Sequence, residues 1–154
     1  MKDVLEVMKI AQETEKKSRI FYLEASEKSK SILASAVLRS LADDEADHER
    51  IIERYYNAMT KSQHWPIYEE EKIETADQRI EKILEDTGKS IEKDPSFDGV
   101  YRAACEKEKA TRDFYAQEAN KADDIQLKKF YSFLANLESI HVKMLDLLVE
   151  EVNP

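Results

Sequence analysis

The chain has 154 residues, enough for one domain (1–154), and it combines 37% charged residues with only two glycines and three prolines, which favours a mostly helical protein. Its formal net charge of −9 argues against a nucleic-acid partner, and its single cysteine, Cys105, excludes an internal disulfide. No apolar run approaches the roughly 18 residues of a membrane span and no signal peptide opens the chain, so we expect a cytoplasmic protein with no membrane partner.

A first pair of helices is predicted over residues 3–59. Asp3, followed three residues later by Glu6, has the pattern of an N-cap with a capping box, so the first helix is expected at 3–28. A polar turn separates it from a second helix, which is expected at about 32–58. Because this turn is short, the two helices are predicted to lie antiparallel.

One carboxylate of the first helix lies on an otherwise apolar face. Glu15 is seven residues after Met8 and seven before Tyr22, so it shares the inward stripe of the helix. Glu13 lies roughly 200° around the helix from Glu15 and is predicted to face solvent. A glutamate aimed into a core is a candidate metal ligand.

Residues 60–94 are expected to form a long crossover between two helix pairs. Pro66 cannot continue a helix, so the segment around it is predicted to be extended and to cross the end of the bundle. Thr75 with Gln78 predicts a second capping box, which opens a short helix that ends at Gly88.

A second helix pair is predicted over residues 95–151. Asp94 followed by Pro95 is typical of a helix start, because proline is favoured at the first helical position. Asp123 or Asp124 is expected to cap the last long helix.

The two halves of the sequence repeat at one constant offset of 93 residues. The repeated candidates are Glu15 and Glu108, Glu45 and Glu138, and His48 and His141. No gap is needed between about residue 8 and residue 55 of the first half. The repeat predicts an all-α four-helix bundle made of two pseudosymmetric helix pairs.

Each half carries a Glu-x-x-His pattern on its apolar face. Residues three apart share one face of a helix, so the carboxylate and the imidazole point the same way. Four buried, ionised glutamates without a counter-charge would cost several kcal/mol each in desolvation. Two divalent cations would balance the four negative charges, and two neutral imidazoles would complete the coordination.

The pattern resembles the ferritin-like superfamily, and most closely the di-iron domain of rubrerythrins. The resemblance is carried by residues 15–22 and 41–48, and it is echoed at 108–115 and 134–141. It covers the four long helices and leaves the crossover unmatched. Carboxylate and imidazole ligands of this kind suit iron or manganese. The resemblance therefore implies two Fe ions, with Mn as an alternative.

The same resemblance implies roles for individual residues. The bridging ligands would be Glu45 and Glu138, the terminal carboxylates Glu15 and Glu108, and the imidazole ligands His48 and His141. Tyr22 and Tyr115 would donate hydrogen bonds to ligand carboxylates. Core aromatics with satisfied hydroxyls are an equally open interpretation of these two tyrosines.

The chain also departs from the rubrerythrin pattern. Many rubrerythrins carry a rubredoxin module with two Cys-x-x-Cys pairs, which this sequence lacks, so we expect a separate rubredoxin-like electron donor. Rubrerythrins commonly have a further glutamate where Thr111 stands. Thr111 and Ser18 are interpreted as packing residues, Cys105 as a small buried side chain, and His64 as a loop residue rather than a third metal site.

The expected function is a homodimeric di-iron oxidoreductase that reduces hydrogen peroxide, or O₂, with electrons from an external donor. A ferroxidase that handles iron is the alternative, because bacterioferritins share the doubled Glu-x-x-His pattern. The long crossover and the 13 residues after His141 argue against a storage shell. An oxidase acting on an organic substrate and a metal-dependent structural bundle without turnover also remain open.

Overall fold

The computed structural model describes residues 2–69, 73–88 and 98–152. Its helices within these ranges are α1 (Lys2–Lys28), α2 (Ile32–Ser62), α3 (Ala76–Thr87), α4 (Asp98–Lys121) and α5 (Ile125–Val152). The described residues contain no strand, and none of their helices is both long and apolar enough to cross a membrane. The predicted all-α class is confirmed.

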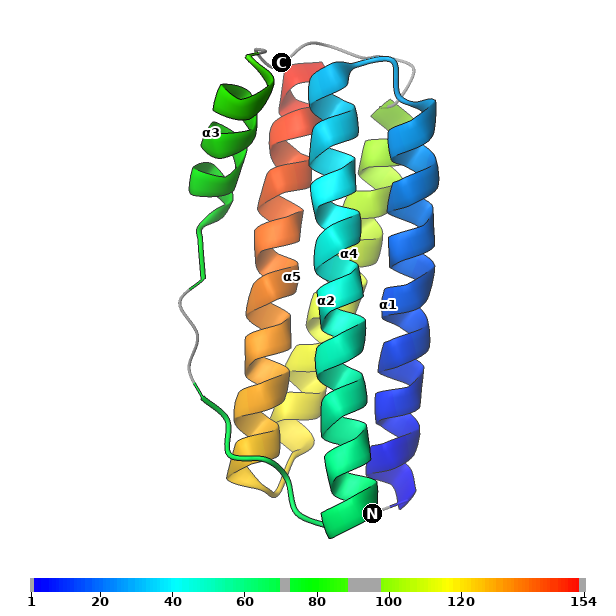
Figure 1. The fold of residues 1–154 in the computed structure, drawn as a ribbon, viewed down its shortest axis with the longest axis vertical. Helices are drawn as coiled ribbons and strands as arrows, with labels where there is room; N and C mark the ends of the chain where they lie inside the picture. The colour runs from blue at the N-terminus through cyan, green and yellow to red at the C-terminus, as the bar shows by residue number, and fades with distance from the viewer. Residues whose placement is uncertain (1, 70–72, 89–97, 153–154) are drawn as a thin grey trace.

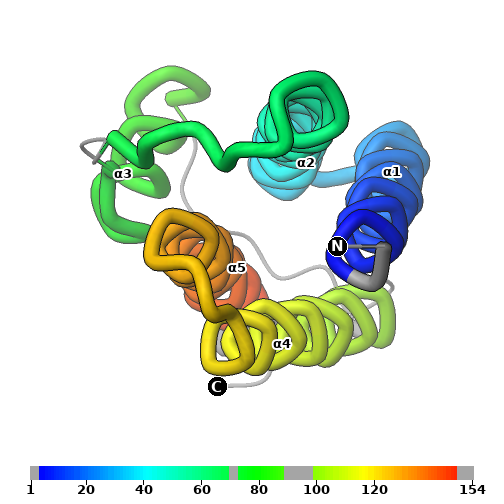
Figure 2. The backbone as a smooth tube through the Cα atoms, turned by 90° about the horizontal axis from the view of Figure 1, so that it is seen from below, coloured from blue at the N-terminus to red at the C-terminus, as the bar shows by residue number. Residues whose placement is uncertain are grey.

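The four long helices form a bundle of two antiparallel pairs (Figure 1). α1 packs against α2, and α4 packs against α5. Viewed along the bundle, the short helix α3 lies outside the four long helices, against α2 and α5 (Figure 2). This arrangement confirms the ferritin-like bundle with a crossover that includes a short helix.

Local capping explains where several helices begin and end. Ser31 caps α2 by accepting a hydrogen bond from the backbone of Ala34. The predicted capping box of Thr75 and Gln78 is confirmed, with both reciprocal hydrogen bonds present. Gly88 ends α3 in the left-handed conformation (φ 64°), where a side chain would be strained.

Other predicted boundaries need adjustment. Asp3 lies inside α1, so its prediction as an N-cap is wrong, because a cap residue lies outside the helix. α2 continues to Ser62, beyond its predicted end near residue 58, and stops where Gln63 turns left-handed. Asp124, rather than Asp123, caps α5 by accepting from two backbone N–H groups. The predicted helix start at 94–95 lies outside the described residues.

The crossover first passes the end of the bundle and then runs along its side. Figure 2 shows the residues after α2 crossing toward α5, and Figure 1 shows α3 at the side of the bundle, near its other end. The backbone N–H of Tyr68 donates to the side chain of Gln126 over 2.7 Å, which ties this segment to the first turn of α5. The described part of the crossover therefore covers the outer face between α2 and α5.

The buried apolar side chains form two clusters. One contains Tyr22, Ala25, Leu38, Tyr101 and Leu145, and the other contains Met8, Ala11, Ile52, Tyr115 and Tyr131. Along α1, Met8 and Ala11 belong to one cluster and Tyr22 and Ala25 belong to the other. Glu15 is buried between these two pairs of residues. A polar layer thus crosses the bundle between two apolar regions.

Candidate metal centre

The polar layer contains all six of the residues singled out by the repeat. They come from four different helices, and each is at most 3% exposed: Glu15, Glu45, His48, Glu108, Glu138 and His141. The helix-pair packing explains the convergence, because equivalent positions of two pseudosymmetric pairs meet at one level of the bundle. Charged residues are almost never buried to this extent unless they are paired or bind an ion.

These side chains form two overlapping groups, in each of which the candidate ligand atoms lie within 4.8 Å of one another. The first group is Glu15, Glu45, His48 and Glu138, and the second is Glu45, Glu108, Glu138 and His141. Only Glu45 and Glu138 belong to both groups. Each group therefore offers three carboxylates and one imidazole to one cation.

Both imidazoles point their Nδ1 atoms at the glutamates. His48 Nδ1 lies 3.4 Å from carboxylate oxygens of Glu15 and Glu138. His141 Nδ1 lies 3.0 Å from Glu45 Oε1 and 3.6 Å from an oxygen of Glu108. The two rings are parallel within 12°, with centroids 5.6 Å apart.

Several atoms that face the centre of this cluster lie close to one another but form no well-oriented hydrogen bond among the described residues. They are one oxygen each of Glu15, Glu45 and Glu108, both oxygens of Glu138, and the Nδ1 atoms of His48 and His141. Unpaired buried polar atoms are costly, and here they all belong to residue types that ligate metals. The residues present therefore fit two divalent cations.

Without cations, burial and the charges within the cluster shift the pKa values of its side chains. Burial disfavours a charged His48 ring, but the carboxylates of Glu138 and Glu15 outweigh burial and raise its pKa to about 9. Burial, together with the charges of Glu108 and Glu15, raises the pKa of Glu138 well above its usual value. Burial also opposes ionisation of Glu108, yet contacts with Glu138 and His141 lower its pKa to about 2. The cluster therefore holds protons that a cation would displace.

Two tyrosines support the carboxylates across the repeat. Tyr22 donates a hydrogen bond of 2.5 Å to Glu108, and Tyr115 donates one of 2.6 Å to Glu15. Burial, followed by the charge of the neighbouring glutamate, raises the pKa of each phenol well above its usual value. Both hydroxyls therefore keep their protons and act as donors, the geometry that the resemblance implies.

Asp44, Arg79 and Ser40 also adjoin the cluster, although neither helix periodicity nor the repeat predicts them. His141 Nε2 lies 2.9 Å from Asp44 Oδ2. Arg79 of α3 pairs with the same carboxylate and donates to Ser40 Oγ over 2.7 Å. One signal in the sequence could have found Asp44: it directly precedes the Glu-x-x-His pattern, whereas the repeat-equivalent residue is Leu137.

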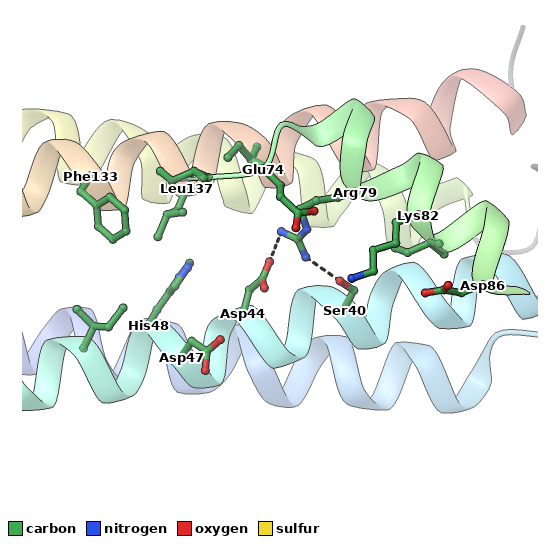
Figure 3. Close-up of a pocket in the computed structure, with 14 residues that line it drawn as sticks. Ser40, Asp44, Asp47, His48, Glu74, Arg79, Lys82, Asp86, Phe133 and Leu137 are labelled. Atoms are coloured by element: carbon green, nitrogen blue, oxygen red, sulfur yellow. Dashed lines mark hydrogen bonds and ion pairs between the residues drawn. The ribbon is translucent and has the colours of Figure 1, made fainter. Parts of the chain in front are cut away.

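A pocket of about 480 Å³ reaches the cluster from the face that the crossover covers (Figure 3). Its walls come from α2, α3, α5 and the two residues Ile73 and Glu74 before α3. His48 and Asp44 line the pocket on the α2 side, and Phe133 and Leu137 line it on the α5 side. The pocket connects the outside of the bundle to the rim of the polar layer.

The remaining candidates do not belong to the two metal-ligating groups. His64 is exposed beyond the end of α2, and Cys105 is buried with its Sγ 3.2 Å from Asp146 Oδ1. Thr111 donates to its own helix backbone at Lys107. These positions agree with their interpretation as loop and packing residues.

Comparison with known proteins places this fold and cluster in a family. A model of the Rubrerythrin family matches residues 6–149. A solved structure of a hypothetical protein from Pyrococcus furiosus is similar with a TM-score of 0.69 and 21% sequence identity, over 99% of this chain and 92% of that chain, and at this identity it shows the fold alone. The search of curated proteins found no match. Because the family match covers nearly the whole chain, this protein belongs to the Rubrerythrin family.

Proposed function

We propose that the protein is a di-iron peroxidase, which reduces hydrogen peroxide to water with electrons from a separate electron-transfer protein. The observation that carries the proposal is the pair of overlapping four-residue groups that share Glu45 and Glu138. Two cations held through shared carboxylates would lie close enough to act on one small substrate. Membership of the Rubrerythrin family supports iron as the metal, although the same ligands also suit manganese.

The ligands divide between the two cation positions. Glu15 and His48 would hold one cation, Glu108 and His141 the other, and Glu45 and Glu138 both. When bound, a pair of ferrous ions supplies the two electrons that, with two protons, convert one hydrogen peroxide to two waters. Four carboxylates balance the charge of two divalent cations, which removes the cost of burying the glutamates unpaired.

The surrounding residues orient the ligands and limit access. Tyr22 and Tyr115 hold Glu108 and Glu15 through hydrogen bonds and keep their own protons at the hydroxyl oxygens. The apolar clusters above and below the polar layer exclude water along the bundle axis. The pocket beside His48 is wide enough for peroxide, so it is our candidate for the route of the substrate.

Electron supply and assembly are part of the same proposal. Among the described residues the single cysteine, Cys105, is buried and lies apart from the metal-ligating groups, so it offers no second redox centre. We therefore propose a rubredoxin-like or similar external protein as the donor. We also propose that the protein acts as a homodimer.

Rapid mixing tests the choice of substrate. The protein is loaded anaerobically with Fe(II) and mixed in separate shots with hydrogen peroxide and with air-saturated buffer, and the appearance of ferric absorption is followed. We expect oxidation by peroxide to be the faster of the two. Oxidation by peroxide that is no faster than oxidation by air would contradict the peroxidase proposal.

Two variants of α1 make the test specific to the site. Glu15→Gln removes a candidate ligand, whereas Glu13→Gln makes the same change two residues earlier, at an exposed position on the opposite side of α1. Loss of a residue that only supports a metal ligand typically costs at least about tenfold in activity. Because Glu15 is itself a candidate ligand, we expect Glu15→Gln to slow the peroxide reaction by more than this factor. Glu13→Gln should react like the unmodified protein.

A further inference from the structure

The two halves of the repeat differ where they face the pocket. Three polar residues of α2 that line the pocket correspond to apolar residues 93 positions later on α5: Ser40 and Phe133, Asp44 and Leu137, Asp47 and Ile140. All six line the same pocket. The pseudosymmetry that builds the cluster is therefore broken at its rim.

Because of this difference, the imidazole of His141 has a carboxylate partner on Nε2, the ring nitrogen that faces away from the cluster. His141 faces Glu45 through Nδ1 over 3.0 Å, while its Nε2 lies 2.9 Å from Asp44 Oδ2. Asp44 is in turn held by Arg79 from α3, which also bonds Ser40 (Figure 3). A continuous chain of contacts therefore joins the crossover helix to one side of the cluster.

In the described part of the chain, the other imidazole, His48, has no such partner. Asp44 is replaced at the repeat-equivalent position by Leu137, whose side chain has no hydrogen-bonding atom. Within the described residues, the polar contacts of His48 all involve Nδ1, at Glu15, Glu45 and Glu138. Figure 3 shows the His48 ring directed into the pocket, toward the side of Leu137.

A carboxylate on the outer nitrogen strengthens an imidazole as a ligand. It accepts the N–H of that nitrogen, which fixes the tautomer so that the lone pair lies on Nδ1, and it holds the plane of the ring. Loss of such a partner typically weakens metal binding by about 10–100-fold. Among the residues that the structure describes, only the His141 side has the carboxylate.

We propose that the two cation positions are unequal and that Asp44, held by Arg79, is the positioning residue that makes them so. The position at His141 binds a divalent cation roughly 10–100-fold more tightly than the position at His48. The His48 position, which adjoins the pocket, fills second and empties first. This inference rests on the metal-binding part of the proposed function.

An anaerobic titration with Co(II) alone tests the inference without any turnover. Visible absorption and calorimetry report each binding step, and the unmodified chain should take up two Co(II) with two separable affinities. Asp44→Leu, which copies the other half of the repeat, should weaken the tight step about 10–100-fold and bring the two affinities together. Arg79→Gln should weaken the same step by a smaller factor.

Two further variants separate positioning from general damage. Asp47→Leu removes a carboxylate of the same pocket that pairs with Arg50 and contacts neither imidazole, so both affinities should stay unchanged. Leu137→Asp supplies His48 with the missing carboxylate and should tighten the weak step. A merely structural role for position 44 would not produce this gain, and the melting temperatures of the metal-free variants identify any loss of folding.

The outcomes distinguish the inference from the proposal on which it rests. Two Co(II) bound with equal affinity, or two affinities that Asp44→Leu and Leu137→Asp leave unchanged, would overturn the inference while the two-cation centre stands. Absence of Co(II) binding to the folded, unmodified chain would overturn both.

Discussion

The hydroxyl of Tyr115, on α4, donates a 2.6 Å hydrogen bond to Glu15, which belongs to the other half of the repeat on α1. Tyr22 and Glu108 form the equivalent bond in the opposite direction, over 2.5 Å. Each helix pair thus holds the terminal carboxylate of the other. The ligand geometry therefore depends on the docking of the two pairs and not on either pair alone.

Removal of the hydroxyl in Tyr115→Phe should weaken divalent metal binding by roughly tenfold, because Glu15 loses the donor that orients it. The free energy of unfolding of the metal-free protein should fall by about 1.5–3 kcal/mol, the range for a hydrogen bond to a charged group. Metal titration and denaturant unfolding measure the two effects.

Tyr56→Phe is the matched control for this change. Tyr56 is half-buried on α2, and its ring lies under the ammonium of Lys9, away from the cluster. Its variant should bind metal with unchanged affinity. Equal metal affinities for Tyr115→Phe and Tyr56→Phe would contradict the role given to Tyr115.

The metal-free protein should lose stability as the pH rises above neutral. The pKa of His48 is 6.5 in an ordinary environment and about 9 in the fold, where Glu138 and Glu15 favour the charged ring against burial. A raised pKa contributes stability that is complete below about 6.5 and is lost as the pH rises through about 9. Thermal unfolding at pH 6 and pH 9.5 measures this difference.

Two histidine variants isolate that effect. His48→Gln should reduce the loss of stability between pH 6 and pH 9.5, whereas His64→Gln, at an exposed position, should retain it. A metal-free protein with equal stability at both pH values would show that the cluster does not hold the proton assigned to His48.

Cys105 should be a poor nucleophile in the folded protein. Burial and the nearby Asp146 raise the pKa of its thiol to about 11. At pH 8 we expect alkylation by iodoacetamide to be at least roughly 100-fold slower than in unfolded protein, because the thiolate is the reactive form. Rapid alkylation of the native protein, or loss of metal binding in Cys105→Ala, would be inconsistent with a packing role.

The parts of the site that follow from helix periodicity could be predicted from the sequence. Glu15 was identified because it falls on an apolar stripe, and a constant offset then predicted which residues would share its layer. The capping box at Thr75 and Gln78 is equally local, so it too was predicted. The predicted cap at Asp3 misses the start of α1 by a residue or two, the usual uncertainty of a helix end, because helix ends fray.

The contact between Asp44 and Arg79 could not be predicted in the same way. Arg79 lies on α3, outside the repeat, and it reaches Asp44 only because α3 docks against α2 and α5. Docking of this kind depends on the path of the crossover, which no period in the sequence encodes. The crossed pairing of Tyr22 with Glu108 likewise depends on how the two helix pairs face one another.

The assembly state separates the peroxidase from an iron-storage protein. We expect size-exclusion chromatography with light scattering to give the mass of a dimer, about twice 17.9 kDa. A hollow shell of many subunits would favour the ferroxidase alternative, because storage needs an enclosed volume. The measurement requires only the unmodified chain.

The central claim is that six side chains, three from each half of the repeat, hold two cations. Crystals loaded anaerobically with Fe(II) and measured at the iron absorption edge test it directly. The account predicts two anomalous peaks about 3.5–4 Å apart, the usual separation in two-metal sites, bounded by the two groups that share Glu45 and Glu138. Iron bound elsewhere on the protein, or a cluster without iron at saturating Fe(II), would contradict it.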